Sequence, residues 1–440
     1  MEIFIKVVQL LLSLSILVIV HELGHFIAAR VFKTRVEKFY LFFDPWFSLF
    51  KFKKGDTEYG VGWIPLGGYV KISGMIDESM DKEQMKLPPQ PWEFRSKPAW
   101  QRLIIMLGGV TVNVLLAIVI YIVMLTVMGE QYLPTSGLKY GITVDSLGYE
   151  MGLRNGDKIL SIDQKQVDDF NDIPKTIMLE EAKTLQVQRG DSAMDVHVPA
   201  GFIGKLMKQK SPTFIVERIP FEVGDYVPGS PAKKAGILVN DRIIGINDSI
   251  TPYFDQFRAL VPQYKAQTAQ VVVIRKGDTL KIPVNVNAEG FIGVQARPSN
   301  AFLAYNKIEY NLLTAIPAGF VKTFESAGNY VKSMKLLKEK DAYKSIGGFM
   351  SIGNIFPSAW NWAAFWSLTA FLSIMLAILN ILPIPALDGG HVMFLFYEII
   401  FRRKPSDKFM EYAQVVGMVI LFGLLIFANG QDLLKWFSSM

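Results

Sequence analysis

Two histidines and a glutamate within five positions are the residues of this sequence best placed to do chemistry: His21, Glu22 and His25. On a helix, imidazoles four residues apart share one face and lie about 6 Å from each other, so both can reach a single metal ion. Glu22 is turned by about 100° and can touch a water on that metal without binding the metal itself. This H-E-x-x-H spacing is typical of zinc hydrolases and predicts one Zn²⁺ per chain. The alternative, two histidines hydrogen-bonded inside a helix bundle, leaves Glu22 unexplained.

The motif lies in an apolar run from about residue 3 to residue 32, where each ionisable side chain is costly. Half of the 440 residues are hydrophobic and the mean hydropathy is +0.26. These values favour a membrane protein with a sizeable water-exposed part. The net charge of +6 comes from residues spread along the chain, so we expect no nucleic-acid partner. Cysteine is absent, and any metal must therefore be held by His, Asp or Glu.

Four apolar segments are long enough to cross a membrane, and they predict a multi-pass α-helical membrane protein with four transmembrane helices. The first segment has no basic cluster or small-residue cleavage site, so we expect it to stay in the protein rather than be removed as a signal. The segments lie at 1–32, 103–128, 363–386 and 412–430.

Lysine and arginine are frequent in the loop 33–102 and fill the connection 402–404, which predicts that both face the cytoplasm. Both termini and the long region 129–362 would then lie outside the cytoplasm. His21 would lie toward the cytoplasmic half of the membrane.

The loop 33–102 is predicted to contain a β-hairpin over 57–73, with two strands joined by Pro65-Leu66-Gly67-Gly68. The hairpin is rich in aromatic residues and poor in charge, which indicates a membrane-associated element, and the stretch 42–47 also looks membrane-facing. It could offer an edge to an extended segment of a substrate. It could equally be a structural plug between helices.

The extramembrane region contains an internal repeat, because the pattern of residues 148–163 returns at 230–247. Each copy resembles the middle of a PDZ domain, and this resemblance predicts an α+β region of two tandem PDZ-like domains at 130–205 and 217–297. Such domains commonly bind peptide ends by strand addition. Here they could bind peptides or restrict access by their bulk. The segment 300–350, helical over 300–344, is predicted to be amphipathic, either at the membrane surface or as a solvated linker.

A third metal ligand is expected where the third apolar segment ends. Pro383 and Pro385 cannot continue a helix, and Asp388 follows in apolar surroundings where a carboxylate needs a proton or a cation. Asp388 could instead cap the next helix, and His391, one turn further on, could be the ligand in its place. In the second segment, Gly109 and Asn113 share a helical face, which favours close helix packing with a hydrogen bond and a role as site scaffold.

The H-E-x-x-H at 21–25, the N-x-x-P-x-P-x-L-D-G at 380–389, the G-x-x-x-N at 109–113 and the tandem PDZ-like insert together resemble the site-2 protease family of intramembrane zinc metalloproteases. The resemblance covers essentially the whole chain. It implies His21, His25 and Asp388 as zinc ligands, Glu22 as the catalytic base, and Asn380 as a residue that engages substrate.

The resemblance also implies a bacterial cytoplasmic-membrane enzyme that cuts inside the transmembrane helix of a single-span protein substrate. Membrane-bound anti-sigma factors already trimmed by a first extracytoplasmic cut, and remnant signal peptides, are the expected substrates, with membrane lipid as the surrounding partner. The chain departs from the family at 42–45, where Phe-Phe-Asp-Pro replaces a usual Gly-Phe-Gly, and at 348–349, where Gly-Phe replaces Gly-Pro. Two other readings compete: a non-catalytic PDZ membrane scaffold with a structural zinc, and a metal transporter, which would need polar residues along several helices.

Overall fold

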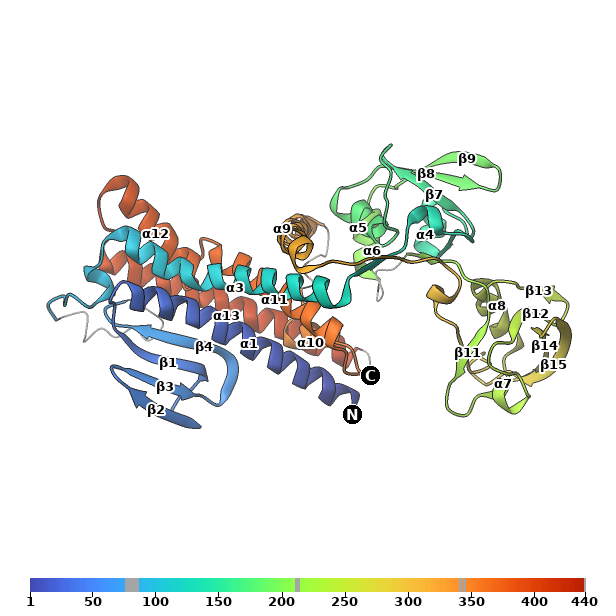
Figure 1. Cartoon of the computed structure of the whole chain (residues 1–440), viewed down its shortest axis with the longest axis horizontal. Helices are drawn as coiled ribbons and strands as arrows, with labels where there is room; N and C mark the ends of the chain where they lie inside the picture. The colour runs from blue at the N-terminus through green and yellow to red at the C-terminus, as the bar shows by residue number, and fades with distance from the viewer. Residues whose placement is uncertain (76–86, 210–213, 340–342, 344–345, 439–440) are drawn as a thin grey trace. The chain divides into compact units, whose positions relative to one another are not determined.

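The computed structural model describes residues 1–440 except 76–86, 210–213, 340–342, 344–345 and 439–440. Parts of the predicted cytoplasmic loop and of the 300–350 segment therefore lie outside the described residues. The chain forms two compact units: one comprises 1–129, 309–337 and 343–440, and the other comprises 130–308 with 338–342. Each is described by itself (Figure 1).

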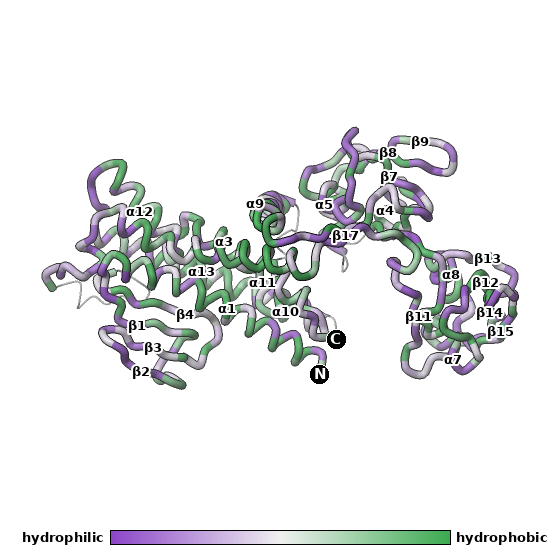
Figure 2. The backbone as a smooth tube through the Cα atoms, viewed as in Figure 1, coloured by the Kyte–Doolittle hydropathy of each residue, from purple (hydrophilic) through white to green (hydrophobic). Residues whose placement is uncertain are grey.

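The first unit is built on four helices that are each long and apolar enough to cross a membrane, as the hydropathy pattern predicts. Figure 2 shows hydrophobic residues along most of their length. The helix α3 packs against both α1 and α11, and buried side chains such as Leu17, Ile105 and Phe365 fill the contacts. The four helices are α1 (Glu2–Val31), α3 (Ala99–Met128), α11 (Trp362–Ile381) and α13 (Asp407–Phe437).

Further helices complete the first unit. The amphipathic helix predicted to begin near residue 300 begins instead at Leu312, because Asn311 caps it and residues 306–308 pair as a strand. The short helix α10 packs against α1 and α13. These elements are η1 (Phe94–Ser96), α9 (Leu312–Met334), η5 (Lys335–Lys338), α10 (Phe349–Ile355) and α12 (Asp388–Phe401).

A four-stranded sheet lies against α1 (Figure 1). The predicted hairpin over 57–73 is wrong, because β3 and β4 do not pair with each other: the strand order is β2-β3-β1-β4. The strand β1 separates them, parallel to β3 and antiparallel to β4. It fits there because Gly60 and Gly68 let the backbone approach Tyr40, where a Cβ would meet Tyr40 atoms at 2.3 Å and 2.6 Å. The strands are β1 (Val36–Phe43), β2 (Phe50–Lys54), β3 (Thr57–Val61) and β4 (Ile64–Ile72).

The second unit has two hydrophobic cores. The first core draws on residues from Leu133 to Leu303, and the second on residues from Phe221 to Ile292. The first half of the unit extends beyond residue 205, where the first PDZ-like domain was expected to end. Phe214 is buried in the first core, and β10 pairs with β6. The short ribbon of β5 and β17 joins the two ends of this unit.

The strands of this unit are β5 (Glu130–Tyr132), β6 (Ile142–Val144), β7 (Lys158–Ile162), β8 (Thr184–Arg189), β9 (Ser192–His197), β10 (Ile215–Glu217), β11 (Val223–Tyr226), β12 (Arg242–Ile246), β13 (Ser249–Ile250), β14 (Thr268–Arg275), β15 (Asp278–Asn285), β16 (Val294–Ala296) and β17 (Asn306–Ile308). Its helices are η2 (Thr135–Gly137), α4 (Ser146–Met151), α5 (Asp172–Leu179), α6 (Phe202–Lys208), α7 (Pro231–Lys234), α8 (Phe254–Leu260), η3 (Val261–Tyr264) and η4 (Ser299–Ala301).

The internal repeat carries one ion pair in both copies. Asp157 accepts two hydrogen bonds from Arg189, which also donates to the Gly152 carbonyl. At the equivalent place, Asp241 accepts two hydrogen bonds from Arg275, whose guanidinium also donates to a glycine carbonyl, that of residue 236. The two halves of the unit therefore share local structure as well as sequence pattern.

Candidate metal centre

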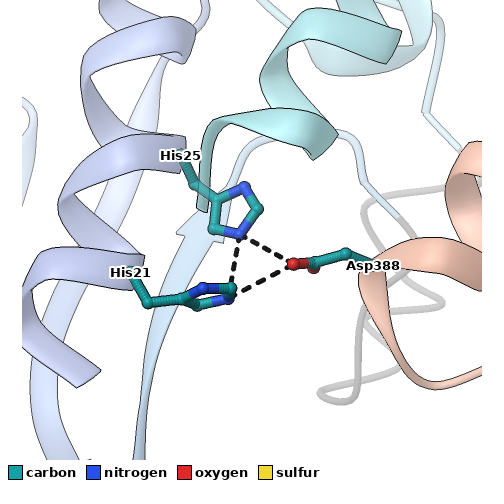
Figure 3. Close-up of side chains that lie close together, drawn as sticks. All are labelled: His21, His25 and Asp388. Atoms are coloured by element: carbon teal, nitrogen blue, oxygen red, sulfur yellow. Dashed lines mark hydrogen bonds and ion pairs between the residues drawn. The ribbon is translucent and has the colours of Figure 1, made fainter. Parts of the chain in front are cut away.

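His21 and His25 stand on successive turns of α1, and Asp388 points at them from the first residue of α12 (Figure 3). The two Nε2 atoms are 3.3 Å apart, and Asp388 Oδ2 is 3.2 Å from each of them. Both histidines are buried. Within the described residues, this is the one group of His, Asp and Glu side chains close enough to share a metal ion.

The spacing suits tetrahedral zinc. Bonds of about 2.0–2.2 Å to nitrogen and oxygen keep ligand atoms roughly 3.3–3.6 Å apart, close to the distances in this triangle. Asp388 Oδ2 is moreover buried without a well-formed hydrogen bond among the described residues. A buried carboxylate oxygen in that position is unfavourable unless a cation or proton compensates it. The residues present therefore fit Zn²⁺.

Backbone and amide groups orient the two imidazoles. His25 Nδ1 lies 2.8 Å from the Ile105 carbonyl oxygen, so Nδ1–H donates there and Nε2 keeps its lone pair for a metal. The Asn113 amide lies 3.1 Å from His21 Nδ1. The nitrogen and oxygen of the Asn113 amide can be exchanged by turning the group over, so that the oxygen accepts a hydrogen bond from His21 Nδ1–H. The lone pair of His21 Nε2 is then free for a metal, as it is in His25. The backbone at Asn113 is held by Ser373, whose hydroxyl donates to the Asn113 main-chain carbonyl at 2.8 Å.

Gly109 gives the imidazoles their space. A Cβ at this position would lie 2.4 Å from His25 Nε2 and 2.5 Å from His21 Cε1, closer than any side chain tolerates. Gly24, which precedes His25, and Gly108, which precedes Gly109, bring the two helix backbones together, since a Cβ on Gly24 would lie 2.3 Å from the Gly108 carbonyl oxygen. Small residues at both places let α3 approach the metal-binding face of α1.

The break after α11 presents Asp388. The helix ends at Ile381, and Pro383 and Pro385 lie in the turn that follows. Leu387 occupies the N-cap position of α12 and Asp388 the first helical position, so Asp388 does not cap this helix. Ala386 adopts a φ of +78° and donates its N–H to Gln414 Oε1 at 3.1 Å, which ties the turn to α13.

A cavity of about 620 Å³ opens beside the three side chains. Glu22 and His391 line it together with the strand β4, and His391 is not part of the metal-binding group. The remaining histidine, His197, lies on β9 in the second unit, where its Nδ1 is 3.2 Å from Thr184 Oγ1. Asn380 reaches the site from α11, with its amide 3.3 Å from His21 Nε2.

The wall of the cavity also carries charged and hydroxyl groups from β1, from β4 and from the residue that follows β1, among them Lys38, Asp44, Tyr69 and Lys71. Tyr69 donates its hydroxyl to Asp44 Oδ1 at 2.8 Å, and Ser48 donates to Oδ2 of the same carboxylate at 2.9 Å. Burial and the Asp44 carboxylate both raise the pKa of Tyr69, which therefore stays protonated as a donor. Asp44 belongs to the Phe-Phe-Asp-Pro stretch that departs from the usual family pattern.

Sequence reasoning missed two polar residues that position the site, Ser373 and Gln414. Both are buried inside apolar helices. Polar side chains there are rare because they cost free energy without a partner, and this rarity was the available signal.

A family model described as peptidase family M50 matches residues 9–424. The chain belongs to this family. Family M50 comprises the site-2 proteases, which depend on zinc, so the chain is a zinc metalloprotease.

Similar proteins come from several bacteria. A putative zinc metalloprotease of Rickettsia conorii, RC0203, is 27% identical over 436 residues, which cover 99% of this chain and 100% of the relative. The regulator of sigma E protease of Haemophilus influenzae is 27% identical over 97% of this chain and 98% of its own length. Protease RseP of Yersinia pestis is likewise 27% identical, with the same two coverages. The likeness to this M50 group thus extends over the second unit as well as the metal centre.

Proposed function

We propose that this M50 protease cuts peptide bonds inside membranes, with His21, His25 and Asp388 as its zinc ligands and Glu22 as its catalytic base. The observation that carries the proposal is the triangle of three metal-binding atoms beside a cavity that Glu22 also lines. A structural zinc usually has four protein ligands, whereas three donors come together among the described residues. This ligand count favours an enzyme over a PDZ scaffold with a structural zinc.

Zinc, when bound, supplies a Lewis acid that polarises a peptide carbonyl and makes water acidic enough to attack near neutral pH. The Glu22 carboxylate takes the proton from the attacking water and returns it to the leaving amine. Asn113 and the Ile105 carbonyl hold the two imidazoles in orientation. Asn380, whose amide lies 3.3 Å from His21 Nε2, hydrogen-bonds a backbone group of the substrate.

The substrate is the transmembrane helix of a single-span protein. Its carbonyls are hidden by helical hydrogen bonds, and the segment must unwind before it can react. The strand β4 is an edge strand of its sheet and lines the cavity, so an extended segment can pair with it and exchange helical for strand hydrogen bonds. A similar protein is named regulator of sigma E protease, which supports anti-sigma factors already trimmed outside the membrane as the proposed substrates. Remnant signal peptides are also proposed, because they too are single apolar helices.

The proposed orientation puts the loop 33–102 and the basic connection 402–404 in the cytoplasm of a bacterial inner membrane. Both termini and the second unit then lie outside. The N- and C-termini lie at the same end of the helices in Figure 1, as an even number of spans requires. The two halves of the second unit act as PDZ-like domains, and the shared Asp–Arg pair supports their common origin.

The test is cleavage of a single-span substrate by Glu22→Gln in membranes. We expect zinc content to remain at one ion per chain while cleavage is lost, and Asp388→Ala to lose both. Glu2→Gln, which changes an exposed glutamate on the same helix, is the matched control and should cleave normally. Continued cleavage by Glu22→Gln would remove Glu22 from the mechanism, and full zinc content in Asp388→Ala would remove Asp388 from the ligands. Single-span fragments that accumulate in membranes carrying Glu22→Gln would identify the substrates.

A further inference from the structure

A hollow of about 580 Å³ lies just past the C-terminal end of α1. None of the residues that line it also lines the cavity at the metal centre. Its wall is formed by the last turn of the helix, the turn that follows, and residues from two other parts of the first unit. The lining residues are Arg30, Lys33, Thr34, Arg35, Asp56 and Trp92.

Positive charge dominates the hollow. Arg30, Lys33 and Arg35 face one carboxylate, Asp56, which lies 3.9 Å from the Arg35 guanidinium. The exposed Lys33 side chain makes no hydrogen bond or ion pair within the described residues, although the Lys33 backbone N–H donates to the Arg30 carbonyl. With one carboxylate against three cations, the hollow keeps a net charge of two positive units, which suits a mono- or dianion.

The basic side chains of the hollow are not needed as hydrogen-bond donors to the last backbone carbonyls of α1. The Thr34 N–H donates to the Ala29 carbonyl and the Phe32 N–H to that of Ala28, while Lys33 turns back with a φ of +55°. The backbone therefore satisfies the carbonyls of Ala28, Ala29 and Arg30. The cationic side chains remain available to a ligand.

Two buried donors in the wall lack acceptors. Thr34 is 1% exposed, and its Oγ1 has no hydrogen-bond partner among the described residues, nor does Arg35 Nε. The backbone of Arg35 is fixed, because its N–H donates to the Trp92 carbonyl and its carbonyl accepts from the Ser73 N–H. A buried donor without an acceptor is destabilising, and a small rotation of either side chain toward an anionic oxygen in the hollow would give it a charge-assisted hydrogen bond.

We propose that this hollow binds a phosphate group, with Thr34 and Arg35 as the buried donors and Arg30 and Lys33 as the outer cations. Three acceptor oxygens and one to two negative charges match this set of donors. The hollow lies at the end of a helix long enough to cross a membrane, beside the half-exposed indole of Trp92. Basic and aromatic residues at such a position are typical of contacts with lipid head groups. The phosphate therefore belongs either to an anionic phospholipid or to a free phosphate ion.

The experiment measures binding to the full-length chain with its zinc. In one arm, the protein in nanodiscs of phosphatidylcholine is titrated with phosphatidylglycerol; in the other, the protein in detergent is titrated with inorganic phosphate. Thr34→Val removes the buried hydroxyl at nearly constant shape, and Lys33→Gln removes one charge. The matched control is Lys51→Gln with Lys53→Gln, which removes two exposed charges from β2.

We expect Thr34→Val and Lys33→Gln each to weaken binding by about tenfold, in keeping with the loss of one charge-assisted hydrogen bond, and the control to change it less than twofold. This pattern with phosphatidylglycerol alone assigns the site to lipid, and the same pattern with inorganic phosphate assigns it to the free ion. Equal binding by the parent chain and both variants, in both arms, overturns the proposal. Neither variant touches the metal centre, so unchanged zinc content in each shows that the protein is folded.

Discussion

Adding one methyl group at Gly109 is expected to displace the zinc ligands while leaving the helices folded. A Cβ there lies 2.4 Å from His25 Nε2, whereas ordinary contact begins near 3.4 Å, so the ring or the helix must move by about 1 Å. Metal sites tolerate deviations of only about 0.2 Å in their ligand distances. The displacement is therefore several times larger than the site can absorb.

The cost to folding is smaller. Overpacking of this kind costs about 1–3 kcal/mol, and replacing glycine by alanine inside a helix returns about 0.5–1 kcal/mol. The net loss of roughly 0–2.5 kcal/mol leaves a stable membrane domain within the usual range of about 5–15 kcal/mol. Zinc affinity, by contrast, should fall by at least the roughly 10–100-fold seen when groups that merely orient a ligand are removed.

The assay compares zinc per chain, cleavage of a single-span substrate and thermal unfolding for Gly109→Ala. Gly423→Ala is the matched control, because that glycine is also in a helix and a Cβ there meets nothing within 4 Å. We expect the control to keep its zinc and activity. A Gly109→Ala protein with one zinc per chain and full cleavage would refute the argument that this glycine shapes the metal centre.

Three further outcomes are expected. Burial opposes ionisation of Asp241, but hydrogen bonds from Arg275 and the Leu238 N–H outweigh it and lower its pKa. The ionised Asp241 carboxylate therefore stabilises the folded state fully above the ordinary carboxyl pKa of about 3.9, and this stabilisation is lost as pH falls through the lower folded pKa. Hydrogen exchange of β12 amides should show that Asp241→Asn lowers the free energy of opening by about 3 kcal/mol at pH 7. The difference between the parent chain and the variant should disappear below about pH 4. Tyr69→Phe should keep its zinc and lower kcat/KM about fivefold, since Asp44 loses one hydrogen bond of about 1 kcal/mol. Zinc loss in this variant would contradict the assignment of Tyr69 to the cavity wall and not to the metal-binding group. A chelator should abolish cleavage and added Zn²⁺ should restore it, whereas activity that survives complete zinc removal would exclude metal catalysis.

The sequence was informative about the metal centre because polar residues in apolar helices have few explanations. His21, Glu22 and His25 are closely spaced on one helix, so their relative positions follow from helix geometry alone. Asp388 is distant in sequence, but the two prolines before it predicted a break at membrane depth, and an isolated carboxylate there needed a cation. The four long apolar helices were predicted for a similarly general reason.

The strand order of the sheet beside α1 could not be predicted in this way. Adjacent strands with a short turn between them usually pair, and nothing local to residues 57–73 shows that β1 inserts between them. The arrangement depends on long-range contact: Gly60 and Gly68 leave room for the Tyr40 ring and backbone, and the pairing partners of β1 are 20 to 36 positions away. The end of the first core at Phe214 was missed likewise, because β10 pairs with a strand far earlier in the chain.

The residues of the metal centre also fall into two groups, those that local sequence reveals and those whose role depends on helix packing. The side chains proposed to bind zinc or to activate water can be found in the sequence, because ionisable residues are rare in apolar segments. The residues that set the distances between helices are recognised only once the helices are packed. Gly109 is an ordinary small residue in the sequence, yet in the fold its missing side chain leaves the space that the two imidazoles occupy. Gln414 likewise looks like an incidental polar residue, yet it holds the turn before Asp388 through the Ala386 N–H. A metal centre assembled from α1, α3, the turn before α12 and α13 therefore depends on helix packing as well as on its three proposed ligands. Substitutions at Gly109 and Gln414 should impair it, although neither residue belongs to the metal-binding group.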